Sequence, residues 1–281
     1  MLKLRKFPHK EFCPLIYKAL TVAGSDSSGG AGIQADLKTF QEHGVYGLTA
    51  ITTIVAMDPH NQWVHLVFPQ PVTTVQAQLE TSVRGVGIDA MKTGMLGSPE
   101  IIELVARTID EHQITRVVVD PVMVCKGTDE VLHPENTISL REQLVPRALV
   151  VTPNLFEAAQ LAGMPPITTL EEMQEAAVQI HRLGARYVLV KGGSKLPHSR
   201  AIDLLYDGRE FTVLEAARVE TTYTHGAGCT YSAAITANLA RGLAVPDAIA
   251  AAKNYITGAI KNGFPINQYV GPTCHFWQRL Q

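Results

Sequence analysis

The sequence has few cysteines, and their spacing is unlike that of a disulfide framework or a metal site. The 281 residues include four cysteines, at positions 13, 125, 229 and 274, and no two of them form a Cys-x-x-Cys pair. Four separated cysteines in a chain of this size are typical of free thiols in a reducing compartment. We therefore expect a cytoplasmic protein.

The sequence also lacks a large net charge and any long apolar run. The net charge is −2 at pH 7, so no overall basic field exists to bind nucleic acid or an anionic membrane. Hydrophobic residues make up 46%, which is too many for a disordered chain. No apolar run approaches the roughly 18 residues that a membrane helix needs. These features favour a globular protein with neither nucleic acid nor a membrane as partner.

The first 18 residues differ from the rest, because they are basic and irregular. They contain neither the apolar core nor the small-residue cleavage site of a signal peptide. We expect a poorly ordered extension over residues 1–18, with a partner-binding arm as the alternative. Residues 19–281 are then expected to form one domain.

From residue 19 onward, short apolar segments alternate with segments of helical periodicity. We expect strands at 19–24, 48–57, 88–92, 116–120, 148–152 and 186–191, and helices at 33–43, 72–83, 99–111, 155–162, 170–183, 227–241 and 246–262. Two edge-type strands, 201–206 and 210–214, flank a hairpin turn at 207–208. This alternation predicts an α/β fold whose mostly parallel sheet is covered on both faces. In such a sheet, ligands bind outside the carboxyl ends of the strands, where five polar or glycine-rich segments fall.

The first of these chemical segments, residues 224–229, reads THGAGC and precedes a predicted helix. Small residues at Gly226, Ala227 and Gly228 let backbone N–H groups converge on an anion, such as a phosphoryl group in transfer. Cys229 falls in the first helical turn, where we expect the positive end of the helix dipole to lower the thiol pKa. It could then accept a proton from a substrate hydroxyl. The alternative is a glycine turn that only caps a packing helix.

A second segment, residues 24–32, reads GSDSSGGAG. No Lys follows its glycines, so it is not the common phosphate-loop motif. A dinucleotide loop is disfavoured as well, because it needs an acidic residue about 20 residues on, at the end of the next strand, and Asp58 lies too far along the chain. Asp26 either forms a structural Asx turn or binds substrate hydroxyls.

Two further segments carry a carboxylate and a lysine. Residues 152–157 read TPNLFE, and the spacing of Asn154 and Glu157 is that of a helix capping box. A carboxylate at that helix start could instead hold a hydrated Mg²⁺. Residues 190–195 read VKGGSK, in which Lys191 could reach nucleotide phosphates or belong to an ordinary surface loop.

The last segment, residues 120–127, reads DPVMVCKG. Asp120 ends an apolar strand, and Cys125 stands beside Lys126 in a glycine-bounded loop. A neighbouring cation favours the thiolate, which adds readily to an aldehyde. The alternative is a small buried hydrophobe in a hinge.

Together these motifs resemble the ribokinase superfamily of small-molecule kinases. AGSDSSGGAGIQADLKTF, KTGML, DPVM, VTPNLFEA, KGG and THGAGC occur in this order between about residues 19 and 272. The most similar branch holds the hydroxymethylpyrimidine (phosphate) kinases and their pyridoxal-kinase relatives. The resemblance implies a ribokinase-like three-layer αβα sandwich, ATP and a small vitamer as ligands, and a homodimer with residues 63–68 as an edge contact.

The resemblance also implies a role for each matching residue. Residues 226–229 form the anion hole, and Cys229 is the general base where most of the superfamily carries Asp. The implied nucleotide-binding residues are Asn154, Lys191, Gly192, Gly193, Ser194, Lys195, Asp203 and Gly228. Glu157 organises Mg²⁺, and Asp120 is a second candidate for its hydration shell. The acceptor pocket is lined by Asp26, Met57, Met95, Val122 and Cys125. The resemblance leaves a monovalent cation open as a further cofactor.

Two positions favour pyridoxal as the acceptor. Met57 stands where the pyrimidine kinases usually carry Gln, and a Met side chain packs on a ring but cannot pair with an amino group. Cys125 matches a dual-cysteine pyridoxal-kinase subgroup, in which the thiol captures the aldehyde as a hemithioacetal. We therefore expect 5′-phosphorylation of pyridoxal, and of pyridoxine and pyridoxamine, in vitamin B6 salvage. Hydroxymethylpyrimidine as the acceptor, dual activity, and a non-catalytic vitamin- or nucleotide-binding protein are the alternatives.

Overall fold

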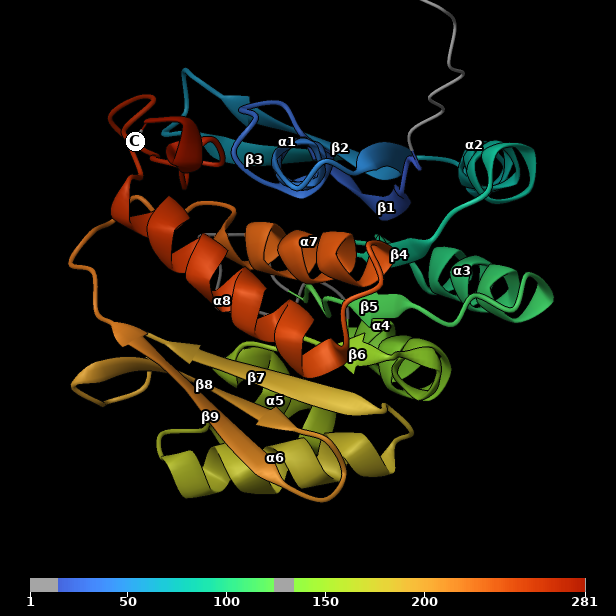
Figure 1. Ribbon diagram of the computed structural model, residues 1–281. Helices are drawn as coiled ribbons and strands as arrows, with labels where there is room; N and C mark the ends of the chain where they lie inside the picture. Colours follow the sequence, from blue (N-terminus) through green and yellow to red (C-terminus); the bar gives the residue numbers. More distant parts are fainter. Residues whose placement is uncertain (1–14, 124–133, 281) are drawn as a thin grey trace, which may run out of the picture.

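The computed structural model describes residues 15–123 and 134–280, which form three layers around one central sheet (Figure 1). The order of the nine strands is β3-β2-β1-β4-β5-β6-β7-β8-β9. Their bounds are β1 (Lys18–Asp26), β2 (Tyr46–Asp58), β3 (Val64–Pro69), β4 (Ala90–Thr93), β5 (Val117–Val119), β6 (Val150–Val151), β7 (Tyr187–Gly193), β8 (Arg200–Tyr206) and β9 (Phe211–Ala217). In the sheet, β2, β1, β4, β5, β6 and β7 run parallel to one another, whereas β3, β8 and β9 are each antiparallel to the strands they pair with. The predicted α/β fold with a mostly parallel sheet is confirmed.

Helices cover both faces of the sheet. The described helices are α1 (Gly32–Glu42), α2 (Val72–Leu79), α3 (Pro99–Glu111), α4 (Pro134–Ser139), α5 (Leu155–Ala162), α6 (Leu170–Arg182), α7 (Ala227–Ala240) and α8 (Val245–Lys261). On one face α1, α7 and α8 pack around buried residues such as Phe40 and Ile249, and on the other α2, α3, α5 and α6 pack around residues such as Met91 and Ile180. Because both faces are covered, the central strands β5 and β6 consist of fully buried valines.

Most boundaries follow the sequence signals that predicted them. Helix α3 begins at Pro99, and the Ser98 side chain accepts the N–H of Ile101 at 3.4 Å, as the N-cap pattern indicated. The predicted helix 72–83 differs, because α2 ends at Leu79 and continues as a π-helix over Glu80–Val86. Strand β9 extends beyond the predicted 210–214 to Ala217, since its ladder with β8 runs the full length of that strand. In the described parts of the chain, no helix is both long and apolar enough to span a membrane.

Candidate active site

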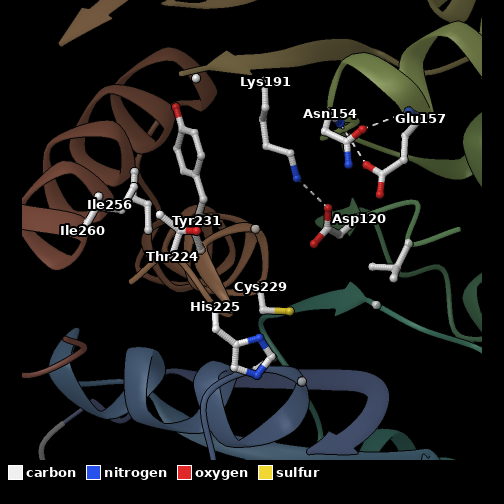
Figure 2. Close-up of a pocket in the computed structure, with 18 of the residues that line it drawn as sticks. Asp120, Asn154, Glu157, Lys191, Thr224, His225, Cys229, Tyr231, Ile256 and Ile260 are labelled. Atoms are coloured by element: carbon white, nitrogen blue, oxygen red, sulfur yellow. Dashed lines mark hydrogen bonds and ion pairs between the residues drawn. The ribbon is translucent and has the colours of Figure 1, made fainter. Parts of the chain in front are cut away.

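The chemical segments of the sequence meet in one cavity of about 870 Å³ at the carboxyl ends of the parallel strands (Figure 2). Each candidate site residue that falls within 15–123 or 134–280 lines this cavity. Cys125 lies outside the described residues. A volume of this size is typical of a small-molecule site and leaves room for more than one ligand.

The start of α7 forms a tight loop that faces the cavity. Gly226 has φ +75°, and a Cβ at this position would overlap the carbonyl oxygen of Gly30, so only glycine fits. The N–H of Ala227 is engaged by the Thr224 carbonyl oxygen at 3.1 Å. The first N–H groups of a helix have no partner within it, which makes Gly228 and Cys229 the donors best placed for an anion.

Cys229 is a partly exposed residue. The pKa of its thiol shifts in the direction opposite to the one we expected. Burial raises the pKa of Cys229 to about 11, against the opposing effects of the Lys92 ammonium and the Gly32 backbone N–H. The prediction that the helix terminus lowers this pKa is therefore wrong for the ligand-free protein. The reason is that desolvation of the thiolate outweighs the helix dipole. Cys229 and Cys274 are both free thiols, as expected.

Asp120 is held from three sides in the middle of the cavity. Its carboxylate pairs with Lys191 Nζ at 2.9 Å and accepts the hydroxyls of Thr152 at 3.0 Å and Ser232 at 3.1 Å (Figure 2). Burial alone would raise the pKa of Asp120, but Lys191 and Lys92 hold it below its usual range. Lys191 therefore stands as a buried cation beside an ionised carboxylate, next to Gly228 of the anion-binding loop.

The capping box at α5 is confirmed, and it also belongs to the cavity wall. Asn154 Oδ1 accepts the Glu157 N–H at 2.9 Å, and Glu157 Oε2 accepts the Asn154 N–H at 2.8 Å. Burial and the neighbouring Asp120 raise the pKa of Glu157 to about 7, although Lys191 opposes the shift. A carboxylate that is costly to ionise in the free protein is one that a bound cation would stabilise.

These oxygen donors fit a hydrated Mg²⁺. Within the described residues, no three His, Cys, Asp or Glu side chains converge as a metal site. Magnesium usually keeps several waters and takes one or two carboxylates together with substrate phosphates. Glu157 could supply a direct oxygen, and Asp120 could hold one of the metal's waters.

At the end of the cavity predicted to bind the acceptor, the Asx-turn interpretation of Asp26 is confirmed. Its oxygens accept the N–H groups of Ser28 and Ala31 and contact His225 Nε2, each at 2.8 Å. Burial would raise the pKa of Asp26, but the bonds from His225 and Ser28 lower it overall. Met57, Met95 and Val122 supply the apolar wall here. His65 of β3, which pairs with Met57 across the β2–β3 ladder, also lines the cavity.

At the end of the cavity predicted to bind the nucleotide, the glycine-rich end of β7 is braced by a buried ion pair. Asp203 accepts the Gly193 N–H at 3.1 Å and pairs with Lys253 Nζ at 2.6 Å. Gly192, Ser194 and Lys195 also line this end of the cavity. Asp203 thus holds the backbone of this glycine-rich segment in place through its bond to Gly193.

Lys92, His65 and His225 are three of the cavity residues that the sequence reasoning missed. Lys92 opens the KTGML motif and is completely buried, paired with Asp36 at 2.8 Å. A lysine at the end of an apolar strand was the signal that could have marked it. His225 stands within THGAGC, and its partner Asp26 is 199 residues away in the chain. His65 carried no signal beyond its place on an edge strand.

The fold and the cavity together define a phosphotransferase of the α/β class, with an anion-binding helix start between two ligand-sized ends. The phosphomethylpyrimidine kinase family matches residues 26–274, and the chain belongs to this family. The predicted resemblance to the hydroxymethylpyrimidine and pyridoxal kinases, and with it the ribokinase-like sandwich, is thereby confirmed.

The names of individual relatives point to two kinds of acceptor, B6 vitamers and hydroxymethylpyrimidines. The chain is 63% identical to the pyridoxine kinase of Bacillus subtilis over 94% of its length and 98% of that protein. It is 45% identical to the hydroxymethylpyrimidine/phosphomethylpyrimidine kinase of the same organism, over 93% of this chain and 95% of that one. Among solved structures, the ADP complex of B. subtilis pyridoxal kinase has TM-score 0.92 and 62% identity, covering 95% of this chain and 100% of that one. The Staphylococcus aureus pyridoxal kinase with AMP-PCP and pyridoxal has TM-score 0.88 and 46% identity, covering 93% and 94%.

Proposed function

We propose that this protein transfers the γ-phosphoryl group of ATP to the 5′-hydroxymethyl group of pyridoxal, and also of pyridoxine and pyridoxamine. The product from pyridoxal is pyridoxal 5′-phosphate, in vitamin B6 salvage. The observation that carries the proposal is the anion-binding loop with Cys229, which lies in one cavity between an apolar acceptor end and a glycine-rich nucleotide end. Identity of 63% to a pyridoxine kinase supports the choice of acceptor. ADP formation that requires added pyridoxal tests it, and its absence would favour a non-catalytic binding protein.

The reaction follows from the positions of the groups. Lys191 and the turn at Gly192–Lys195 bind the nucleotide phosphates, and the N–H groups of Gly228 and Cys229 receive the moving phosphoryl group. The substrate O–H bond breaks as Cys229 takes the proton, the oxygen bonds to the γ-phosphorus, and the bond to the β–γ bridging oxygen breaks to release ADP. Only the thiolate can take this proton. At neutral pH and a pKa of about 11, roughly one thiol in ten thousand is ionised.

We further propose Mg²⁺ as the metal that accompanies ATP. When bound, it would neutralise charge on the phosphates. Glu157 would hold it directly and Asp120 would hold one of its waters. The raised pKa of Glu157 supports this assignment, because a nearby cation favours the ionised carboxylate. Dependence on a monovalent cation stays a separate proposal, tested by exchanging potassium for a bulky organic cation.

The second cysteine of the proposal, Cys125, acts on the aldehyde of pyridoxal. Its sulfur bonds to the carbonyl carbon and the carbonyl oxygen takes a proton, which gives a hemithioacetal without any further reactant. Pyridoxine has an alcohol in place of the aldehyde and cannot react in this way. Cys125→Ala should therefore reduce kcat/KM for pyridoxal more than for pyridoxine. An equal loss on both substrates would remove this role.

Hydroxymethylpyrimidine is the second candidate acceptor, with dual activity as an intermediate case. The 45% identity to a hydroxymethylpyrimidine/phosphomethylpyrimidine kinase favours it, while Met57 in the cavity wall disfavours it. A thioether offers no hydrogen bond to an amino-pyrimidine. Met57→Gln should raise activity on hydroxymethylpyrimidine relative to pyridoxal, if this position reads the ring.

We also propose a homodimer in the cytoplasm. Strand β3 is antiparallel at one edge of the sheet and exposes Val64, Leu66, Val67 and Phe68 by 43–52%. An exposed apolar edge strand is a ready site for pairing with another chain, and a second copy presents the same edge. The cytoplasmic location is proposed from the free cysteines.

A further inference from the structure

A buried ion pair lies beneath the anion-binding loop, where the steps above do not use it. Lys92 Nζ of β4 lies 2.8 Å from Asp36 Oδ1 of α1, and both side chains are 0% exposed. Asp36 Oδ2 also accepts the Thr21 hydroxyl at 2.6 Å. Burying two charges costs several kcal/mol per ion, and apolar replacements are often as stable. Stability alone is therefore a weak reason for a charged pair at this place.

The pair is placed to act on Cys229. Helix α1 packs against α7, and α7 packs against β4, so α7 contacts the two elements that carry the pair. Lys92 also lines the cavity that Cys229 lines. Asp36 accepts one of the three ammonium hydrogens of Lys92, and the same Nζ lies 3.9 Å from the position of a Cβ at Gly94 in the cavity wall.

Four charged groups on the surrounding elements interact electrostatically with the Cys229 thiol. Lys92 from β4 favours the thiolate, whereas Asp36 from α1 and Asp120 after β5 disfavour it. Lys191 from β7 also interacts with Cys229, but it is paired directly with Asp120. Lys92 thus favours the thiolate, and its own partner Asp36 disfavours it together with Asp120.

We propose that Lys92 is a positioning residue for phosphoryl transfer: its buried ammonium, held in place by Asp36, stabilises the thiolate of Cys229 as the acceptor of the substrate proton. This inference rests on the proposed function, in which Cys229 accepts that proton. It assigns opposite electrical effects to the two members of one ion pair. A purely structural pair would instead respond in the same way to the loss of either member.

The test compares Lys92→Met with Asp36→Asn by alkylation of Cys229. Iodoacetamide reacts with the thiolate, and mass spectrometry of the Cys229 peptide gives the rate at this cysteine alone as a function of pH. Lys92→Met should slow alkylation at pH 8 by about tenfold or more, which corresponds to about one unit of pKa. Asp36→Asn should accelerate it by about tenfold. Changes in the same direction, or no change, would overturn the proposal.

Two further variants separate charge from packing. Thr21→Val removes a hydrogen bond to the same Asp36 carboxylate without changing any charge, and alkylation should stay within about twofold of wild type. Lys92→Arg keeps the charge and should restore alkylation to within about threefold. A change in Thr21→Val as large as that in Lys92→Met would overturn the proposal. If Lys92→Met does not fold, the alkylation rate of Asp36→Asn tests the proposal by itself. Unchanged or slower alkylation in Asp36→Asn would then overturn the proposal.

Turnover provides the second readout. The kcat for pyridoxal should fall in Lys92→Met by about the same factor as alkylation, and it should rise steadily with pH. Slowed alkylation with unchanged kcat would overturn the positioning role. Absence of vitamer-dependent ADP formation in the wild-type protein would instead overturn the proposed function, while the alkylation result would stand.

Discussion

His225 Nε2 lies 2.8 Å from Asp26 Oδ2, and this contact joins the loop before α7 to the loop after β1. Both side chains are nearly buried. Both residues line the cavity, where Figure 2 shows His225 near Cys229. Gly30 keeps the approach close, because a Cβ there would overlap the His225 ring. The pair therefore fixes the end of β1 relative to the loop before α7.

Replacing Asp26 with Asn should weaken this connection. We expect the free energy of unfolding to fall by about 1–3 kcal/mol at pH 7, because a buried carboxylate loses charged bonds, and urea denaturation measures the loss. The pKa of Asp26 in the folded protein is lowered below its usual value of 3.8. Ionised Asp26 therefore stabilises the fold above pH 3.8, and this stabilisation is lost as the pH falls through the folded-state pKa. Asp58, a partly exposed carboxylate that accepts the His60 N–H, provides the control, since Asp58→Asn should change stability little. Equal effects of the two variants would contradict the assignment.

Gly226→Ala should abolish turnover. A Cβ there has no space beside Gly30, and the left-handed backbone adds strain, so the loop must move away from the phosphoryl position. We expect kcat to fall by about a hundredfold or more, the loss typical of a missing oxyanion donor. Gly242→Ala is the matched control, because Gly242 has φ +89° and nothing lies within 4 Å of its Cβ position. That variant should lose stability but keep kcat, and a similar loss of kcat in both would argue against the anion-binding role.

Glu157→Gln should remove the pH dependence of Mg²⁺ affinity. Because the pKa of Glu157 is about 7 in the free protein, the affinity for Mg²⁺ with ATP should rise with pH up to about 7 and then level off. The variant should bind the metal more weakly and lose this rise, which titration calorimetry at several pH values can measure. Glu172→Gln is the control, since Glu172 occupies the same capping-box position on α6 but is partly exposed and does not line the cavity. A Mg²⁺ affinity unaffected by Glu157→Gln would exclude this residue as the metal ligand.

Cys229→Ala should stop turnover of every acceptor, and Cys229→Asp should restore part of it. Since the Cys229 pKa is about 11, the wild-type rate should still rise with pH above 8, whereas a carboxylate base should give a flatter profile. The pH dependence of kcat with pyridoxine measures the difference without aldehyde chemistry. Cys274→Ala serves as the control, because Cys274 is buried away from the cavity. Turnover that survives Cys229→Ala would remove the general-base role.

Charge on strand β3 should separate the proposed dimer. Leu66 and Phe68 alternate along the strand on one face, so Leu66→Glu with Phe68→Glu places two acidic groups in the proposed contact. Light scattering after gel filtration should show a dimer for the wild-type chain and a monomer for the variant. Glu substitutions at the exposed Phe211 and Val213 of β9, on the opposite sheet edge, should leave the dimer intact. A wild-type monomer would overturn the dimer proposal.

The sequence predicted what depends on local signals. The ends of α3 and the capping box at Asn154 follow from side chains within one helical turn, and the apolar strands indicated the parallel sheet. Long-range pairing was not predictable in the same way. Lys92 and Asp36 are 56 residues apart and meet only because α1 packs on β1, the sheet neighbour of β4. The direction of the Cys229 pKa was wrong for a related reason: the helix start is visible in the spacing, but the desolvation of the thiol depends on the packed fold.

The most direct measurement is kcat/KM for pyridoxal, pyridoxine and hydroxymethylpyrimidine, determined side by side with saturating ATP and Mg²⁺. We predict the highest kcat/KM for pyridoxal or pyridoxine and a value at least about tenfold lower for hydroxymethylpyrimidine. The reason is that the Met57 side chain in the cavity wall cannot form hydrogen bonds to the amino-pyrimidine. The Cys229→Ala variant should be inactive on all three. A higher kcat/KM for hydroxymethylpyrimidine than for either B6 vitamer would contradict the proposed function.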